Sequence, residues 1–158
     1  MNRFKSILLK LFAFWRRKEP EVPANLIELH RSFSSSPDFK EYSREIWKRA
    51  GSGFLNVEMA FTVDLDGNYN LSSFTNEQNK LTLQIVPGKT TAIIHTHPNS
   101  SGPKPSTPRS SVNGVGDTGI ADKYSLNIYV VSSRGLWVYD WKSKLSFEIY
   151  KNIDWLLT

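Results

Sequence analysis

Two of the three histidines in this chain are separated by a single residue at the end of an apolar run, TTAIIHTH (90–97). The run has the length and β-branched composition of a strand. Side chains two residues apart on a strand point to the same side. His95 and His97 would therefore project together from the strand end, where their imidazoles could share a metal ion. The alternative is a pair of partly exposed polar residues, because His-x-His alone is weak evidence for a metal site.

A third ligand must come from Asp or Glu, because the chain has no Cys and its remaining histidine, His30, lies far away in the sequence. A catalytic zinc ion typically takes three protein ligands and leaves one position for water. Asp117 is the best candidate, because it follows a long loop (98–116) and opens a short predicted helix (117–124). Its alternative role is an ordinary N-cap of that helix.

Glu58 could supply the proton acceptor that a metal-activated water requires. It lies on the polar phase of an alternating segment, VEMAFTVDLD (57–66). If that strand neighbours the strand 90–97, Glu58 can face the metal, take a proton from the water and pass it to a leaving amine. A solvent-facing Glu on an edge strand is the alternative.

The elements that must position these residues follow from hydrophobic periodicity. A helix is expected after Ser36, which can cap it, with Pro37 at its first position and Gly51 at its end. The loop 98–116 is long enough to be functional. Strands are expected at 57–65, 69–74, 81–86, 90–97, 126–133, 136–141 and about 145–151. This order predicts an α+β fold, with helices packed on a mixed or antiparallel sheet.

The positive charge of the chain is concentrated at its N-terminus. Of 20 Lys and Arg, six lie in residues 1–18, which contain no acidic residue; the remainder has 14 basic against 15 acidic side chains. Nucleic acid is therefore not an expected partner of the domain. The apolar residues of 1–18 follow a helical period, as in a basic amphipathic helix on an anionic membrane surface. A secretory signal peptide and a helix packed on the domain are the alternatives.

These features predict three regions: a basic amphipathic segment (1–18), a linker with at most a short helical turn (19–37) and one domain (38–158). The expected location is cytoplasmic or membrane-associated, with export as the remaining alternative. The oligomeric state does not follow from the sequence.

Glu58, the run HTHP (95–98), the pair PS (105–106) and Asp117 together resemble the JAMM motif of the MPN/JAB zinc metalloprotease superfamily, in particular its bacterial members. The resemblance covers roughly residues 38–140. It implies a cytidine-deaminase-like layered fold, in which helices flank a curved mixed sheet. It also implies one Zn²⁺ held by His95, His97 and Asp117, with Glu58 as general base and acid and Ser106 steadying the oxyanion.

The reaction that the resemblance implies is hydrolysis of a peptide or isopeptide bond in a protein or peptide substrate. One departure from the motif concerns its Asp, which usually follows the Ser by three residues. That position is Arg109 here, and Asp117 lies eleven residues after Ser106. Either the loop carries an insertion or the Asp ligand is lost, and with an insertion Ser110 or Ser111 could replace Ser106. A non-catalytic MPN-like scaffold and a membrane-surface interaction protein are the alternative functions.

Overall fold

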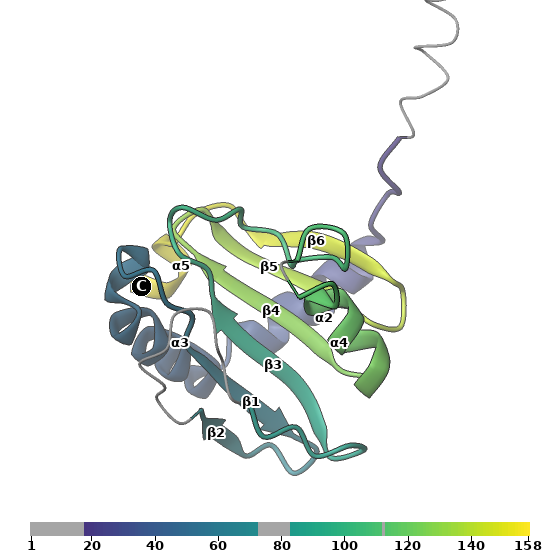
Figure 1. Ribbon diagram of the computed structural model, residues 1–158, viewed down its shortest axis with the longest axis horizontal. Coiled ribbons are helices and arrows are strands. Elements are labelled where there is room, and N and C mark those ends of the chain that lie inside the picture. Colours follow the sequence, from purple (N-terminus) through teal and green to yellow (C-terminus); the bar gives the residue numbers. More distant parts are fainter. Residues whose placement is uncertain (1–17, 73–82, 112) are drawn as a thin grey trace, which may run out of the picture.

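The computed structural model describes residues 18–72, 83–111 and 113–158, which form a six-stranded mixed sheet flanked by helices (Figure 1). This is the α+β architecture that the sequence pattern predicts. The strands lie in the order β2-β1-β3-β4-β5-β6. In chain order the elements are α2 (Ala24–Ser34), α3 (Pro37–Arg49), the 3₁₀ turn η1 (Gly51–Gly53), β1 (Ala60–Asp64), β2 (Tyr69–Leu71), β3 (Thr90–Thr96), α4 (Gly116–Tyr124), β4 (Asn127–Ser132), β5 (Gly135–Asp140), β6 (Leu145–Tyr150) and α5 (Asp154–Leu157).

Among the described strands, β3 and β4 run parallel and the other neighbouring pairs are antiparallel. A parallel pair needs a crossover connection between its strands. Here the crossover consists of the long loop after β3 followed by α4. The two histidines at the end of β3 and Asp117 at the start of α4 therefore lie at the two ends of one crossover loop.

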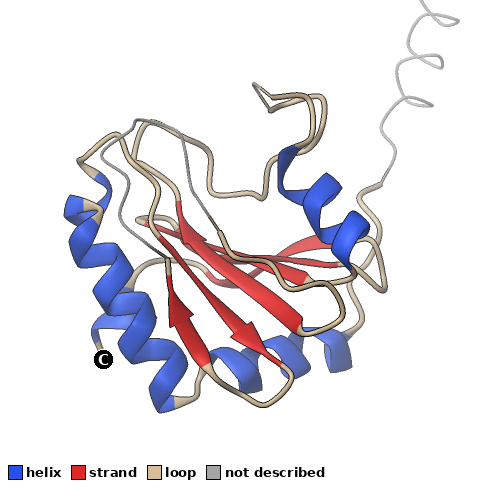
Figure 2. Ribbon diagram, turned by 60° about the horizontal axis from the view of Figure 1, so that its bottom comes forward, coloured by secondary structure: helices blue, strands red, loops and turns tan. Residues whose placement is uncertain are grey.

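The sheet has a hydrophobic cluster on each face, and Figure 2 shows helices on both sides. The larger cluster joins α2, α3 and α5 to the sheet around Phe39, Phe61 and Tyr129. The smaller cluster joins α4 to the opposite face through Ala121 and Ile128. The candidate site lies on the α4 face, because His95 alternates with the core residues of the larger cluster along β3.

The predicted signals of α3 are confirmed. The Ser36 hydroxyl accepts a hydrogen bond from the Phe39 N–H at 3.3 Å, and Pro37 is the first helical residue. The predicted apolar stripe faces the sheet, with Phe39 and Ile46 fully buried. Gly51, at φ +60°, follows the end of the helix and begins a turn that most L-residues avoid.

The segment 19–37 differs from the linker expected from the sequence, because it contains the eleven-residue helix α2. The inward face of α2 includes His30 and Ser34, both buried. These polar residues interrupt the apolar stripe by which an amphipathic helix is recognised. Helix α2 packs against the sheet through Leu26, Ile27 and Phe33.

Residues 83–86 do not form the strand that their alternation predicted, although Leu83 and Ile85 pack against the smaller cluster. The alternation in this segment therefore reflects the burial of one of its faces, although the segment does not pair with any described strand. Residues 73–74 and 81–82 of the predicted strands lie outside the described residues, as does most of the predicted amphipathic segment, residues 1–17. No helix in the described part of the chain has the length and apolar character needed to cross a membrane.

Candidate metal centre

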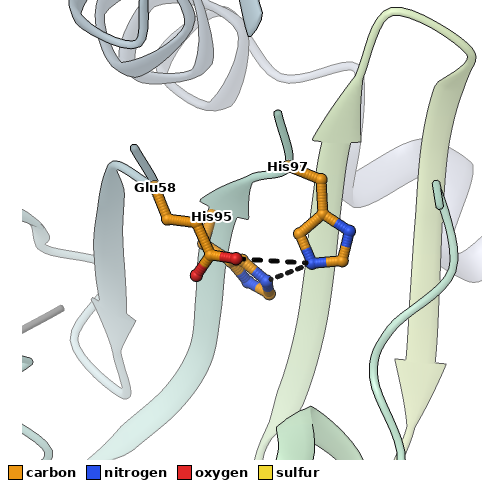
Figure 3. Close-up of side chains that lie close together, drawn as sticks. All are labelled: Glu58, His95 and His97. Atoms are coloured by element: carbon orange, nitrogen blue, oxygen red, sulfur yellow. Dashed lines mark hydrogen bonds and ion pairs between the residues drawn. The ribbon is translucent and has the colours of Figure 1, made fainter. Parts of the chain in front are cut away.

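His95 and His97 lie at the end of β3, which is one of the two central strands of the sheet. β3 is paired on both sides, with His95 opposite Ala60 of β1 and Val130 of β4. The His97 N–H continues the pattern one residue beyond β3 by donating to the Val131 carbonyl at 2.9 Å. Both imidazoles are buried, and their Nε2 atoms lie 3.1 Å apart (Figure 3). The prediction that the two side chains project together is confirmed.

A backbone carbonyl sets the tautomer of His97. Its Nδ1 lies 2.6 Å from the Gly102 carbonyl oxygen, which can only accept a hydrogen bond. Nδ1 must therefore carry a proton, which leaves the Nε2 lone pair of the neutral ring directed toward His95. Such a partner behind a ligand is usual for metal-binding histidines. Gly102 was missed in the sequence because a backbone carbonyl leaves no residue-type signal.

Glu58 lies two residues before β1 and not within a strand as predicted, but the pairing of β1 with β3 still brings it beside the histidines. Next to it, Met59 donates its N–H to the Thr96 hydroxyl at 3.0 Å and accepts from the Thr96 N–H at 2.9 Å. The Glu58 carboxylate lies 4.0 Å from His97 Nε2 (Figure 3). One ligand atom from each of Glu58, His95 and His97 lies within 4.8 Å of the others, so these three side chains form a group that could hold a metal ion.

Asp117 reaches the same place from the first turn of α4. One carboxylate oxygen lies 3.5 Å from His95 Nε2 and the other 3.8 Å from His97 Nε2. The eleven-residue spacing from Ser106 is therefore compatible with an Asp at the site, because the intervening loop returns the chain to the histidines. The long spacing therefore does not remove the Asp117 carboxylate from the histidines.

Of the three candidate serines, Ser106 is the one that forms hydrogen bonds with Asp117. Its N–H and its hydroxyl donate to the same Asp117 oxygen at 2.7 and 2.9 Å, and its Oγ accepts from the Asp117 N–H at 3.0 Å. Ser110 instead bonds with Thr107, and Ser111 with Asn113, within the exposed part of the loop. The geometry thus selects Ser106 over Ser110 and Ser111 as the partner of the site.

Buried opposite charges govern protonation at the site. Burial alone would lower the pKa of His95, but the Asp117 carboxylate and, less strongly, that of Glu58 raise it to about 9. Burial would raise the pKa of Asp117, but His95 and the Ser106 N–H hold it well below its usual range. Burial and the neighbouring charge of His95 lower the pKa of His97. Without a metal, the pair of histidines therefore carries one positive charge at neutral pH, on His95.

The arrangement fits a divalent metal ion. Two imidazole nitrogens bound about 2.0–2.1 Å from a tetrahedral zinc ion lie roughly 3.4 Å apart, close to the 3.1 Å observed. A metal ion would also replace the proton that now separates two buried histidines and a carboxylate. Nitrogen and oxygen ligands without thiolate suit zinc among other divalent metals.

Searches against known protein families, curated proteins and solved structures found no match for this chain.

Proposed function

We propose that this protein is a zinc-dependent metallopeptidase of the JAMM type, which hydrolyses a peptide or isopeptide bond. The observation that carries the proposal is the convergence of His95, His97, Asp117 and Glu58 from separate segments of the chain, with ligand-atom distances of 3.1 to 4.0 Å along the cluster. This convergence is what the resemblance to the JAMM motif required, and it supports the proposed MPN/JAB-like fold as well.

His95, His97 and Asp117 would hold the ion in this proposal. Zinc lowers the pKa of a water to near 7 and polarises a carbonyl oxygen, which provides a nucleophile at neutral pH. Glu58 is partly exposed, whereas His95 is almost fully buried. The carboxylate of Glu58 can therefore meet both solvent and substrate, accept the proton of the attacking water and deliver it to the leaving amine.

Ser106 has two tasks under this proposal. In the structure its hydroxyl proton is directed at Asp117. Donation to a developing oxyanion requires that hydroxyl to rotate, a contribution worth on the order of 10²-fold in rate. The Ser106 backbone N–H, 2.7 Å from Asp117, would keep the carboxylate in place during the rotation.

The test compares Glu58→Gln with Glu41→Gln, an exposed Glu on α3 away from the site. Zinc content is measured by atomic absorption, and hydrolysis is measured on a panel of peptide and isopeptide substrates. Glu58→Gln should retain zinc and lose at least 10²-fold of the activity, while Glu41→Gln should match the parent. Full activity in Glu58→Gln would remove Glu58 from the mechanism.

The ligand assignment is tested separately with His95→Ala, His97→Ala and Asp117→Ala. Each should lose stoichiometric zinc while retaining a cooperative thermal transition. A parent protein that binds no zinc would instead favour the non-catalytic, scaffold function.

A further inference from the structure

The loop segment Gly102–Ser106 contacts the candidate centre at both of its ends. The Gly102 carbonyl accepts from His97 Nδ1 at 2.6 Å, and Ser106 holds the Asp117 carboxylate by two hydrogen bonds. These five residues therefore link two of the proposed metal ligands to each other. Any displacement of the segment would change the orientation of both.

Two prolines restrict the conformation of this segment. Pro103 and Pro105 have fixed φ angles, and each also disfavours helical backbone at the residue before it. Pro105 is buried, although it lies in a loop. The segment therefore has fewer accessible conformations than an ordinary loop, but the prolines alone do not fix it against the sheet.

Lys104, midway between the two ends, contacts Trp137 of the sheet, and its Nζ also lies 3.8 Å from the exposed Glu19 carboxylate. Its Nζ lies 5.0 Å from the centre of the Trp137 ring, within the range of a cation–π interaction. Trp137 of β5 is opposite Val130 of β4, which is opposite His95 of β3. Directly opposed residues share a face of the sheet, so Trp137 lies on the His95 face two strands away. Trp137 is half-buried.

We propose that Lys104 and Trp137 are positioning residues for the metal centre: their contact fixes the segment Gly102–Ser106 against the sheet, and the segment in turn orients His97 and Asp117. This inference rests on the proposed metal site and extends it to a pair of residues that do not contact the metal. Weakened contact between Lys104 and Trp137 should loosen both ligands together. Changes to outer partners of metal ligands typically cost 10- to 100-fold in affinity.

The experiment uses the full chain with Lys104→Met, which keeps most of the aliphatic stem, Trp137→Leu, and Trp137→Phe, which restores an aromatic ring. The control is Trp141→Leu, because Trp141 also has lysines over its ring, Lys142 and Lys144, but not the loop. The zinc dissociation constant is measured by competition with a chelator. Trypsin cleavage of the Arg109–Ser110 bond in metal-free protein reports loop attachment independently of the metal.

Lys104→Met and Trp137→Leu should weaken zinc binding about 10-fold and accelerate cleavage at Arg109. Trp137→Phe should recover most of both losses, and Trp141→Leu should change neither. Parent-like zinc affinity and cleavage in Lys104→Met would overturn the inference while leaving the proposed function intact. An equal loss in Trp141→Leu would also overturn it. If the parent itself binds no zinc, the proposed function fails first and the inference fails with it. If Trp137→Leu does not fold, Lys104→Met decides alone.

Discussion

At the residue scale, the candidate centre combines charges that would be costly to bury separately. A protonated His95 beside the Asp117 carboxylate forms a buried ion pair, and removal of one partner would leave the other charge uncompensated. His97 stays neutral because burial and its charged neighbour both disfavour a second proton. In the metal-free centre, the proton on His95 therefore supplies the positive charge that a metal ion would supply in the proposed site.

This distribution predicts a pH dependence of zinc binding. Because the pKa of His95 is raised to about 9, zinc must displace its proton at neutral pH, and affinity should rise about tenfold per pH unit from pH 7 toward pH 9. Calorimetry in buffers of different ionisation enthalpy should detect release of at least one proton per zinc at pH 7. An affinity that is independent of pH over this range would contradict the assignment of the proton to His95.

The same pKa shifts predict the stability of the metal-free protein. The pKa of His95 is higher in the folded chain than its ordinary 6.5. The contribution of His95 to the free energy of unfolding is therefore complete below pH 6.5 and is lost as the pH rises through about 9. The free energy of unfolding, measured with urea in chelator-treated protein, should fall over that window. His95→Gln, which cannot be protonated, should show a smaller fall over the same window.

A second buried polar group lies on the opposite face of the sheet and has a structural role. The Tyr129 hydroxyl donates to His30 Nδ1 at 2.6 Å, and His30 Nε2 donates to Asp140 at 3.1 Å. Burial lowers the pKa of His30 despite the nearby Asp140, so the ring is neutral in the fold. The group connects α2 to β4 and β5, which explains why a polar residue occupies the inward face of this helix.

Tyr129→Phe should leave His30 Nδ1 buried without a donor and lower the free energy of unfolding by about 1–3 kcal/mol. Tyr139→Phe is the matched control. Tyr139→Phe removes a partly buried hydrogen bond to Asp122, but Asp122 keeps its contact with Lys144. It should therefore lower the free energy of unfolding by less than Tyr129→Phe. Urea unfolding of both variants gives the comparison. An equal cost for the two substitutions would contradict the structural importance of the His30 group.

At the element scale, the start of α4 determines where Asp117 lies. Gly116 has φ +65°, and a Cβ there would lie 2.6 Å from the backbone of Thr107. This close contact packs the first turn of α4 against the returning loop, next to the Ser106 hydrogen bonds. The loop can therefore be long without placing Asp117 far from the histidines.

Gly116→Ala should displace this contact, lower the free energy of unfolding by about 1–3 kcal/mol and weaken zinc binding. Gly114→Ala is the control, because Gly114 also has positive φ, at +73°, but no neighbour within 4 Å of its added Cβ. It should cost roughly 1 kcal/mol from backbone strain alone and leave zinc binding unchanged. Thermal unfolding and the zinc dissociation constant distinguish the two effects. Equal zinc affinity in both variants would show that Asp117 does not depend on this packing.

At the scale of the whole molecule, the site and both hydrophobic clusters lie within residues 18–158. The basic segment 1–18 is separated in the sequence from the candidate site, whose residues lie between Glu58 and Asp117. We therefore expect removal of the segment to separate two proposed properties: zinc binding by the domain and attraction of the segment to anionic membranes.

A variant lacking residues 1–17 should bind zinc with the parent's affinity and lose most binding to vesicles that contain anionic lipid. Co-sedimentation with anionic and with neutral vesicles measures the second property, and higher salt should weaken it. Vesicle binding that survives the deletion would assign membrane contact to the domain. Loss of zinc on deletion would show that the segment supports the fold.

The sequence predicted the elements whose signals are local. Helix α3 followed from Ser36 and its apolar stripe, and β3 followed from its β-branched run. The common direction of His95 and His97 followed from the two-residue period of a strand. Helix α2 was missed because its inward His30 and Ser34 are polar, and only tertiary partners make such residues inward-facing. Likewise, the alternation of Leu83 and Ile85 correctly indicates burial, but pairing depends on a neighbouring strand that the sequence does not specify.

The chain alone therefore determined which residue types could form the centre and on which strand two of them lie. Only the tertiary structure decided that the loop 98–116 returns Asp117 to the histidines. It also decided that Ser106 rather than Ser110 or Ser111 is the partner of Asp117, and that the Gly102 carbonyl sets the tautomer of His97. The physical reason is that these are contacts between segments distant in sequence. Their energies come from hydrogen bonds and buried charges that exist only when the sheet and the crossover are assembled.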